Sequence, residues 1–173
     1  EDQRFVSDRP DVATWTTSPL DHDVTIAGDV IADLFASTSG TDADWVVKLI
    51  DEYPEAAASA ALGASTPSQT DMASYQLIIN AEIFRGRYRK SFEHPEPIPA
   101  NKAVEYRFSL HAADHTFLKG HRIKVQVQST WFPLYDRNPQ KFVPNIMTAS
   151  PGDFSKATQH IYPASHLILS VSP

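Results

Sequence analysis

Three of the seven histidines lie close together in the sequence, and imidazole nitrogens are common ligands of zinc and other transition metals. His111 and His115 are four residues apart, and His121 follows six residues later. A spacing of four places two ligands on one face of a helix, but the residues on both sides of this segment alternate as in strands. The pattern therefore favours structural or surface histidines over a metal-dependent enzyme, which would need His111, His115 and an acidic residue to converge.

Acidic residues offer a second kind of metal site, because carboxylate oxygens are preferred ligands of Ca²⁺. Asp42, Asp44 and Asp51 form an acidic group, and Asp71 is a further candidate member. The group lacks the glycine and the ligand spacing of an EF-hand loop. We interpret these residues as solvated turn carboxylates and keep Asp42 and Asp44 as the candidate metal ligands.

A nucleophilic serine of the hydrolase type stands in a G-x-S-x-G turn between a strand and a helix, and the sequence has no such pentapeptide. Ser39 and Gly40 are followed by Thr41 and Asp42, which is typical of a turn and provides no oxyanion hole. The spacing of the histidines defines no Ser–His–Asp arrangement, and there is no cysteine. The sequence therefore supplies no catalytic residue and no cofactor-binding residue.

Aromatic side chains are the remaining candidates for ligand contact. Trp131, Phe132 and Tyr135 form a cluster, whereas Trp15 and Trp45 lie elsewhere in the chain. Exposed rings can stack on sugars, but aromatic residues in a β-sandwich more commonly belong to the core. Trp131 and Phe132 remain candidate ligand-facing residues. A stand-alone carbohydrate- or ligand-binding module is thus the alternative function, and it requires a groove lined by the exposed ring of Trp131 or Trp15.

Strands must position all of these residues, because apolar side chains recur at every second position along most of the chain. Ile123, Val125 and Val127 alternate with polar residues after Lys119 and Gly120, a turn in which glycine takes a positive φ angle without strain. The nearly continuous apolar run from Trp45 to Ile50 is typical of a central strand covered on both faces. Further strands are predicted over 12–17, 30–36, 77–84, 86–92, 104–110 and 167–171. Many short strands and thirteen prolines, without a helical period, predict an all-β sandwich or jelly roll of two packed sheets.

The length of 173 residues fits a single domain, 1–173. Residues 55–74 are rich in Ala, Ser and Thr and are predicted to form a flexible surface insertion, with a candidate short helix over 56–62. Residues 133–163 contain five prolines and little periodicity. We expect a long irregular excursion there, with one strand near His160 to Tyr162.

The net charge of −6 argues against nucleic-acid or anionic-membrane partners, because phosphate binding needs clustered Lys and Arg. The densest basic group, Arg85, Arg87, Arg89 and Lys90, is interpreted as a solvated strand face. No apolar run reaches the roughly 20 residues of a membrane helix. The chain opens at Glu1 without an initiator Met or a visible signal peptide, so we expect an excised or processed piece. Its parent protein is periplasmic, secreted or cytoplasmic; the sequence leaves the compartment open.

Three segments carry a resemblance to known proteins. The first is WVVKLIDEYPE at 45–55, the second is IFRGRYR at 83–89, and the third runs from GHR at 120–122 to WFPLYDRNPQ at 131–140. Together they resemble the C-terminal domain shared by cocaine esterase, X-Pro dipeptidyl peptidases, glutaryl-cephalosporin acylases and α-amino acid ester hydrolases. With SPGDF at 150–154, these segments are most similar to those of the α-amino acid ester hydrolases. The resemblance covers nearly the whole chain and weakens only at the Ala/Ser-rich insertion.

This resemblance implies a galactose-binding-domain-like jelly roll at the C-terminus of a serine hydrolase. The Ser–Asp–His triad of such enzymes belongs to an upstream α/β-hydrolase domain with a helical cap, so no catalytic residue is carried over to this chain. The implied role is a non-catalytic domain that packs on the hydrolase and cap domains of the same chain and supports pocket shape or oligomerisation. We expect the parent to be a homo-oligomer. The parent would acylate its serine with an α-amino acyl group, or cleave after an X-Pro pair.

The motif residues are then expected to fix the excursion as a domain or subunit interface. Asn138, held extended by Pro139, would bond nearby backbone amides, and Arg137 would hold a carboxylate such as Asp42 or Asp44. The candidate interface residues are Gly120, His121, Arg122, Tyr135, Asp136, Arg137, Asn138 and Pro139.

Overall fold

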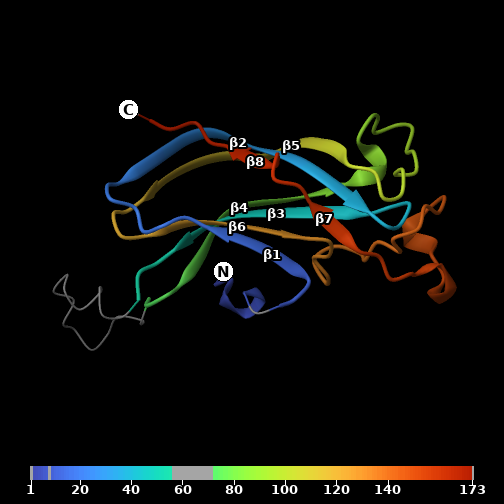
Figure 1. Ribbon diagram of the computed structural model, residues 1–173, viewed down its shortest axis with the longest axis horizontal. Coiled ribbons are helices and arrows are strands. Elements are labelled where there is room, and N and C mark those ends of the chain that lie inside the picture. Colours follow the sequence, from blue (N-terminus) through green and yellow to red (C-terminus); the bar gives the residue numbers. More distant parts are fainter. Residues whose placement is uncertain (1, 8, 56–71, 173) are drawn as a thin grey trace.

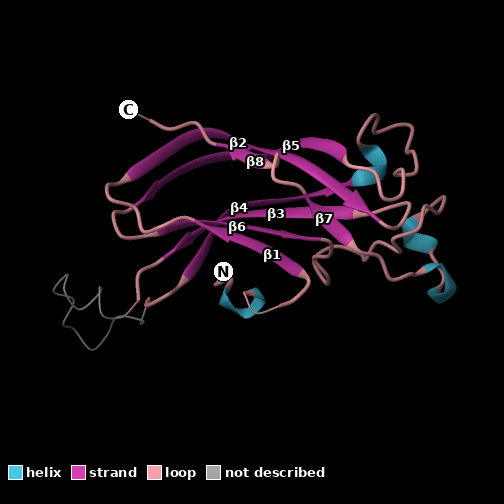
Figure 2. Cartoon of the chain, viewed as in Figure 1, coloured by secondary structure: helices cyan, strands magenta, loops and turns pink. Residues whose placement is uncertain are grey.

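The computed structural model describes residues 2–7, 9–55 and 72–172. In this part of the chain eight strands form two antiparallel sheets that lie face to face, and the helical segments are short 3₁₀ turns (Figure 1, Figure 2). The strands are β1 (Val12–Thr16), β2 (Val24–Thr38), β3 (Asp44–Glu52), β4 (Gln76–Arg85), β5 (Val104–Phe117), β6 (Arg122–Gln128), β7 (Gln159–Ile161) and β8 (His166–Ile168). The 3₁₀ turns are η1 (Arg4–Val6), η2 (Gly86–Tyr88), η3 (Ile146–Thr148) and η4 (Pro151–Asp153). The predicted all-β sandwich is confirmed.

The two sheets are built from strands that are far apart in the sequence. The first sheet has the order β1–β6–β3–β4. The second has the order β5–β2–β7, and β8 also pairs with β2. Strands β1 and β7 therefore end their sheets, and Figure 1 shows them on the same side of the sandwich.

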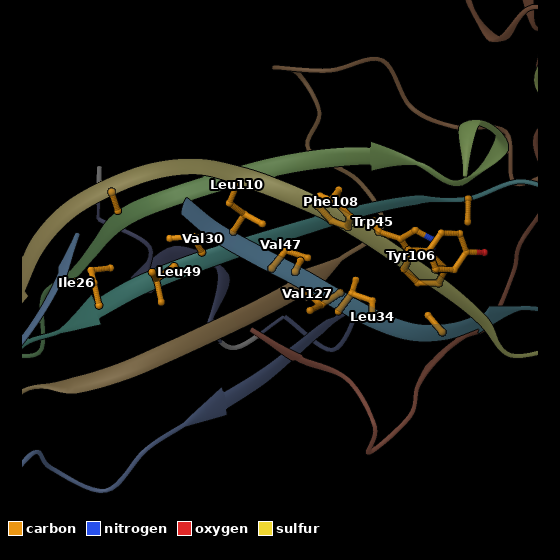
Figure 3. Close-up of a cluster of buried hydrophobic side chains, with 14 of the residues drawn as sticks. Ile26, Val30, Leu34, Trp45, Val47, Leu49, Tyr106, Phe108, Leu110 and Val127 are labelled. Carbon is orange, nitrogen blue, oxygen red and sulfur yellow. The ribbon is translucent and has the colours of Figure 1, made fainter. Parts of the chain in front are cut away.

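The hydrophobic core fills the space between the sheets (Figure 3). It is built by the inward-facing positions of the alternating strands, as the period of two predicts. Each such side chain contributes roughly 1.5–3 kcal/mol by leaving water completely. The central members are Ile26, Val30, Leu34, Trp45, Val47, Leu49, Tyr106, Phe108, Leu110 and Val127.

Strand β3 is buried on both faces, as its apolar run predicts. The face turned away from the core carries Lys48, which is covered by the N-terminal segment and by Trp131. The Lys48 Nζ donates a hydrogen bond to the Gln3 Oε1 at 2.8 Å and lies 5.3 Å from the centre of the Trp131 ring. Burial, with the nearby charge of Arg9, lowers the pKa of Lys48 to about 8.

The strand predicted over 86–92 is wrong. The chain leaves β4 at Arg85 and turns through η2, where the Gly86 N–H donates to the Ala43 carbonyl at 2.9 Å. A Cβ atom at Gly86 would lie 2.7 Å from the Ile98 side chain, so this close approach requires glycine. The interpretation of the basic group as a solvated face also fails, because Arg87 is buried and Arg89 donates to the carbonyls of the following loop.

Two irregular segments interrupt the sandwich. Residues 56–71, which hold most of the predicted flexible insertion and its candidate helix, lie outside the described residues. Residues 129–158, which we call the excursion, connect β6 to β7 and contain only η3 and η4. The strand expected near His160 corresponds to β7. None of the helices described here has the length and apolarity to cross a bilayer.

Candidate functional site

A buried network of charged and amide side chains ties the excursion to the start of β3. We call its members, Asp42, Asp44, Arg85, Arg87 and Asn138, the anchoring network. The first four come from β3, from the turn before it and from the end of β4 with its 3₁₀ turn. Asn138 comes from the excursion, 94 residues after Asp44. The network therefore joins segments that only the fold brings together.

Asp42 forms the inner half of the network. Its side chain is fully buried, and its Oδ2 accepts a hydrogen bond from the Arg87 Nε at 2.8 Å. The Arg87 Nη2 also donates to the Val143 carbonyl of the excursion at 2.7 Å. Burial raises the pKa of Asp42, and the Arg87 charge opposes that rise. Arg87 thus neutralises a buried carboxylate and holds the excursion backbone at the same time.

Asp44 forms the outer half. Its Oδ1 accepts a hydrogen bond from the Asn138 Nδ2 at 2.8 Å, and its Oδ2 lies 3.2 Å from the Arg85 Nη1. The Asn138 Oδ1 in turn accepts from the Gln140 N–H at 2.8 Å. Burial raises the pKa of Asp44 to about 6, despite the opposing effects of Arg85 and Asn138.

The two candidate calcium ligands therefore have guanidinium and amide donors as their partners. Their interpretation as solvated turn carboxylates is wrong, because Asp42 and Asp44 are both buried. Asp71 lies outside the described residues. Within the described residues no group of three or more His, Asp or Glu side chains is arranged to hold a metal ion.

The three closely spaced histidines, at positions 111, 115 and 121, do not form one cluster. The buried Asp51 accepts from His121 Nδ1 through its Oδ1 at 2.8 Å and from His115 Nε2 through its Oδ2 at 2.9 Å. His111 instead contacts Glu82 at 2.8 Å at the exposed surface. The two histidines bind opposite oxygens of one carboxylate, an arrangement in which each satisfies half of a buried charge.

The Gly120, His121 and Arg122 motif lies at the other end of β6 from the excursion (Figure 1). Gly120 has a φ angle of +87°, as the predicted turn requires. Arg122 donates to the Thr17 carbonyl at 2.9 Å, which ties this turn to the segment after β1. The fold thus separates this motif from residues 135–139.

Within the excursion, Arg137 contacts rings and not carboxylates. Its guanidinium lies 5.4 Å from the centre of the Phe132 ring and 5.8 Å from that of Phe154. The pairing predicted with Asp42 or Asp44 is wrong, because Arg87, Arg85 and Asn138 occupy those carboxylates. Tyr135 packs near Trp131, with ring centres 5.7 Å apart, and Asp136 is exposed. Pro139 is buried, and its carbonyl accepts from the Ser155 N–H at 3.0 Å.

The excursion exposes four large apolar side chains. Their exposed fractions are 62% for Phe132, 66% for Leu134, 67% for Met147 and 42% for Phe154. We call these four residues the excursion patch. Short backbone structures hold it: the Asn145 side chain caps η3, and Ser150 and Asp153 form a capping box at η4.

The three tryptophans have different environments. Trp45 is in the core, and Trp131 is partly buried between Lys48 and Tyr135. Trp15 is 48% exposed and lines two adjoining cavities. The ligand-binding alternative requires a groove lined by the exposed ring of Trp131 or Trp15. Trp15 meets this requirement.

Residue types alone did not identify Arg87 and Lys48 as buried charges. The available signal was the apolar run 45–50, since a lysine inside a strand covered on both faces has to be buried. For Arg87, the adjacent Gly86 indicated a turn that takes the chain off the sheet edge. The partner of Arg87 depends on a contact with Asp42, 45 residues away, which no local pattern contains.

Comparisons with known proteins agree with this geometry. The sequence model of one protein family, the X-Pro dipeptidyl-peptidase C-terminal non-catalytic domain, matches residues 3–167. Cocaine esterase from Rhodococcus sp. (strain MB1 Bresler) is 37% identical over 137 residues, which are 79% of this chain and 21% of that protein.

Two solved structures resemble the chain over nearly its whole length. An α-amino acid ester hydrolase labelled with selenomethionine is 50% identical with a TM-score of 0.90, over 99% of this chain and 27% of its own. An aminopeptidase from a marine sediment Thaumarchaeota archaeon is 47% identical with a TM-score of 0.91, over 100% of this chain and 28% of its own. A CocE/NonD family hydrolase from Staphylococcus aureus, at 15% identity and a TM-score of 0.60, shares the fold over 94% of this chain and 30% of its own. The chain thus spans between a fifth and a third of the length of these four proteins.

Proposed function

Because this chain belongs to the family of X-Pro dipeptidyl-peptidase C-terminal non-catalytic domains, we propose that it packs on the α/β-hydrolase and cap domains of its parent polypeptide. There it supports the shape of the catalytic pocket or the oligomeric assembly. The parent is then a serine hydrolase of the ester hydrolase or dipeptidyl-peptidase type. Its nucleophile lies outside this chain, since the chain has no G-x-S-x-G turn.

The excursion patch is the observation that carries this proposal. Four large apolar side chains stand in water on a segment that the anchoring network and two capped turns hold in place. Aromatic residues, Met and Arg are enriched in protein interfaces, and Arg137 lies between two of these rings. A rigid surface loses little conformational entropy on docking. The patch therefore suits a permanent contact with another domain.

The names of the related proteins indicate the chemistry of the parent. One is an ester hydrolase, one an aminopeptidase and one a cocaine esterase. All of these reactions cleave an acyl bond, and a serine nucleophile is able to cleave such a bond through an acyl-enzyme. We expect the acyl group that the parent prefers to depend on the domains outside this chain.

Truncation of the parent tests the proposal. The full polypeptide is compared with a version that ends before residue 1, using the chromogenic p-nitrophenyl ester of an α-amino acid as substrate. We expect the truncated enzyme to lose most of its kcat/KM, its thermal stability or its native oligomeric state. Equal activity, melting temperature and size in the two versions would contradict the proposal.

The alternative, a carbohydrate- or ligand-binding module, is favoured by the exposed ring of Trp15 beside two cavities. It predicts that a soluble oligosaccharide quenches or shifts tryptophan fluorescence, and that replacing Trp15 removes this response. Trp131 offers less to a sugar, because Lys48 and Tyr135 already contact its ring.

A further inference from the structure

The two sheets leave a groove between their edges beside β1. Two cavities of about 530 Å³ and about 490 Å³ share Trp15, Val127 and Ile161 as lining residues, so they form one continuous depression. We call it the Trp15 groove. It is large enough for several side chains of another polypeptide segment.

The walls of the groove come from one margin of each sheet. Strands β1 and β6 form one wall, and β7 with the segment leading into β8 forms the other. The floor includes Leu34 and Val127, which belong to the core and lie next to each other in Figure 3. Leu34 and Val127 are buried beneath the groove, whereas Trp15 and Tyr162 expose much of their rings along it.

The rim carries the side chains that most often anchor interfaces. Trp15 is half exposed at the centre, and Tyr162 lies on the opposite wall. Buried Trp and Tyr dominate the energetics of many interfaces, and an exposed apolar depression of this kind marks a contact surface. Strand β1 also pairs on one side only, within the described residues, so part of its backbone is available to a partner.

Two hydroxyl groups on the wall, those of Ser165 and Tyr162, already have partners within the chain. The Ser165 Oγ accepts from the Phe35 N–H at 2.9 Å, and the Tyr162 hydroxyl lies 3.1 Å from the Ser37 Oγ. A sugar needs free donors and acceptors for its own hydroxyls. The cavity that contains Leu34, Val125 and Leu167 is lined mainly by apolar atoms, so this part of the groove fits an apolar polypeptide segment better than a sugar.

The position of the groove indicates where that segment comes from. Ser129 and Thr158, which begin and end the excursion, both line the groove, so the groove borders the excursion. The α-amino acid ester hydrolase and the archaeal aminopeptidase share this fold over 99% and 100% of this chain, while 27% and 28% of their own length is matched. In those proteins nearly three quarters of the polypeptide is available to cover the groove.

We propose that the Trp15 groove receives an apolar segment of the parent polypeptide from outside these 173 residues, with Trp15 as its central anchor. The inference rests on the proposed function and adds to it a second contact surface beside the excursion patch. The segment packs between the exposed rings of Trp15 and Tyr162 and removes their apolar surface from water.

Photo-crosslinking in the full parent polypeptide tests this inference. Trp15 is replaced by p-benzoylphenylalanine, and the linked peptides are identified by mass spectrometry after irradiation. We expect a link within one molecule, to an apolar segment outside residues 1–173. A link to a second copy, or no link at all, would overturn the inference.

Two controls separate this inference from the proposed function. The same probe at Phe132 reports on the excursion patch. A link from position 132 without one from position 15 would reject the groove inference and support the docking of the domain. No link from either position would reject both proposals. The second control compares Trp15→Ala with Leu118→Ala, a similarly exposed residue on the turn at the other end of the sandwich. We expect Trp15→Ala, and not Leu118→Ala, to raise hydrogen exchange of the covering segment about tenfold or more. Equal exchange in the two variants would also overturn the inference.

Discussion

Charge is buried in this domain where the excursion meets β3, and the energetics of that site depend on each charge keeping its partner. A buried ion pair adds little net stability over an apolar pair of the same shape, but removing one partner leaves an uncompensated charge. Asp42 and Arg87 are both almost completely inaccessible. The anchoring network should therefore tolerate single substitutions poorly, even though it contributes modestly as a whole.

Replacing Arg87 by Met should destabilise the domain by about 3–5 kcal/mol, because Asp42 would stay buried without its cation. Arg9→Met is the matched control, since its pair with Asp11 is solvent-exposed and contributes about 0–1 kcal/mol. Urea denaturation of both variants measures the difference. Similar losses for the two would show that the Asp42 carboxylate finds another partner.

Asp44 should make the stability of the domain depend on pH. Its folded pKa of about 6 exceeds the ordinary aspartate pKa of 3.8, so its contribution is fully present below pH 3.8 and is lost as the pH rises through 6. By linkage this carboxyl should favour folding by about 2 kcal/mol more at about pH 4.5 than at about pH 7. In Asp44→Asn this component should vanish, which unfolding curves at the two pH values would detect. An unchanged difference between them in the variant would assign the effect to other groups.

At the scale of elements, the excursion is held by close backbone contact as well as by ion pairs. The Thr41 N–H donates to the Gln140 carbonyl at 3.1 Å, directly after Gly40. A Cβ atom at Gly40 would overlap this Gln140 oxygen. The β2–β3 connection and the excursion thus touch where no side chain fits between them.

Gly40→Ala should therefore push the excursion off β3 and destabilise the domain by more than the fraction of a kcal/mol typical of surface substitutions. Gly152→Ala serves as control, because a Cβ atom there would lie 4.0 Å from its nearest neighbour on the exposed η4. Limited proteolysis of residues 129–158 gives the readout. Equal cleavage rates in the two variants would mean that the excursion adapts to the methyl group.

At the scale of the whole molecule, the centre of the sandwich is buried, whereas its margins expose apolar side chains. The core between the sheets is continuous, whereas the excursion patch and the Trp15 groove leave apolar surface in water. Monomeric proteins seldom expose such surfaces without a partner. The arrangement fits a domain that is stable in its interior and completed by its neighbours.

The combined replacement of Phe132, Leu134 and Met147 by Ser should separate these two properties. The melting temperature of the 173-residue chain should change little, because these side chains are largely exposed. The full parent polypeptide should lose stability or activity, since its docked interface would contain three buried hydroxyl groups. Thermal scans and ester hydrolysis on both forms test this. A strong loss in the short chain would show that the patch supports the domain's own fold.

The sequence was informative wherever a pattern is local. Local patterns of apolar residues predicted strands β1, β3, β4 and β6 close to their bounds, and Gly120 predicted a turn with positive φ. The double burial of β3 followed from a nearly continuous apolar run. Each of these depends on neighbours within a few residues, which a sequence shows directly.

The partners of the charges could be assigned only from the tertiary structure. Arginine commonly pairs with carboxylates, yet Arg137 packs on the Phe132 ring. Asp42 is paired with Arg87, and Asp44 is hydrogen-bonded to Asn138. Asp51 joins two histidines from separate positions in the chain. The sequence by itself determined the sandwich, its family and the absence of a G-x-S-x-G nucleophile. Which charges are buried depends on contacts between segments 45 to 94 residues apart, and folding alone creates those contacts.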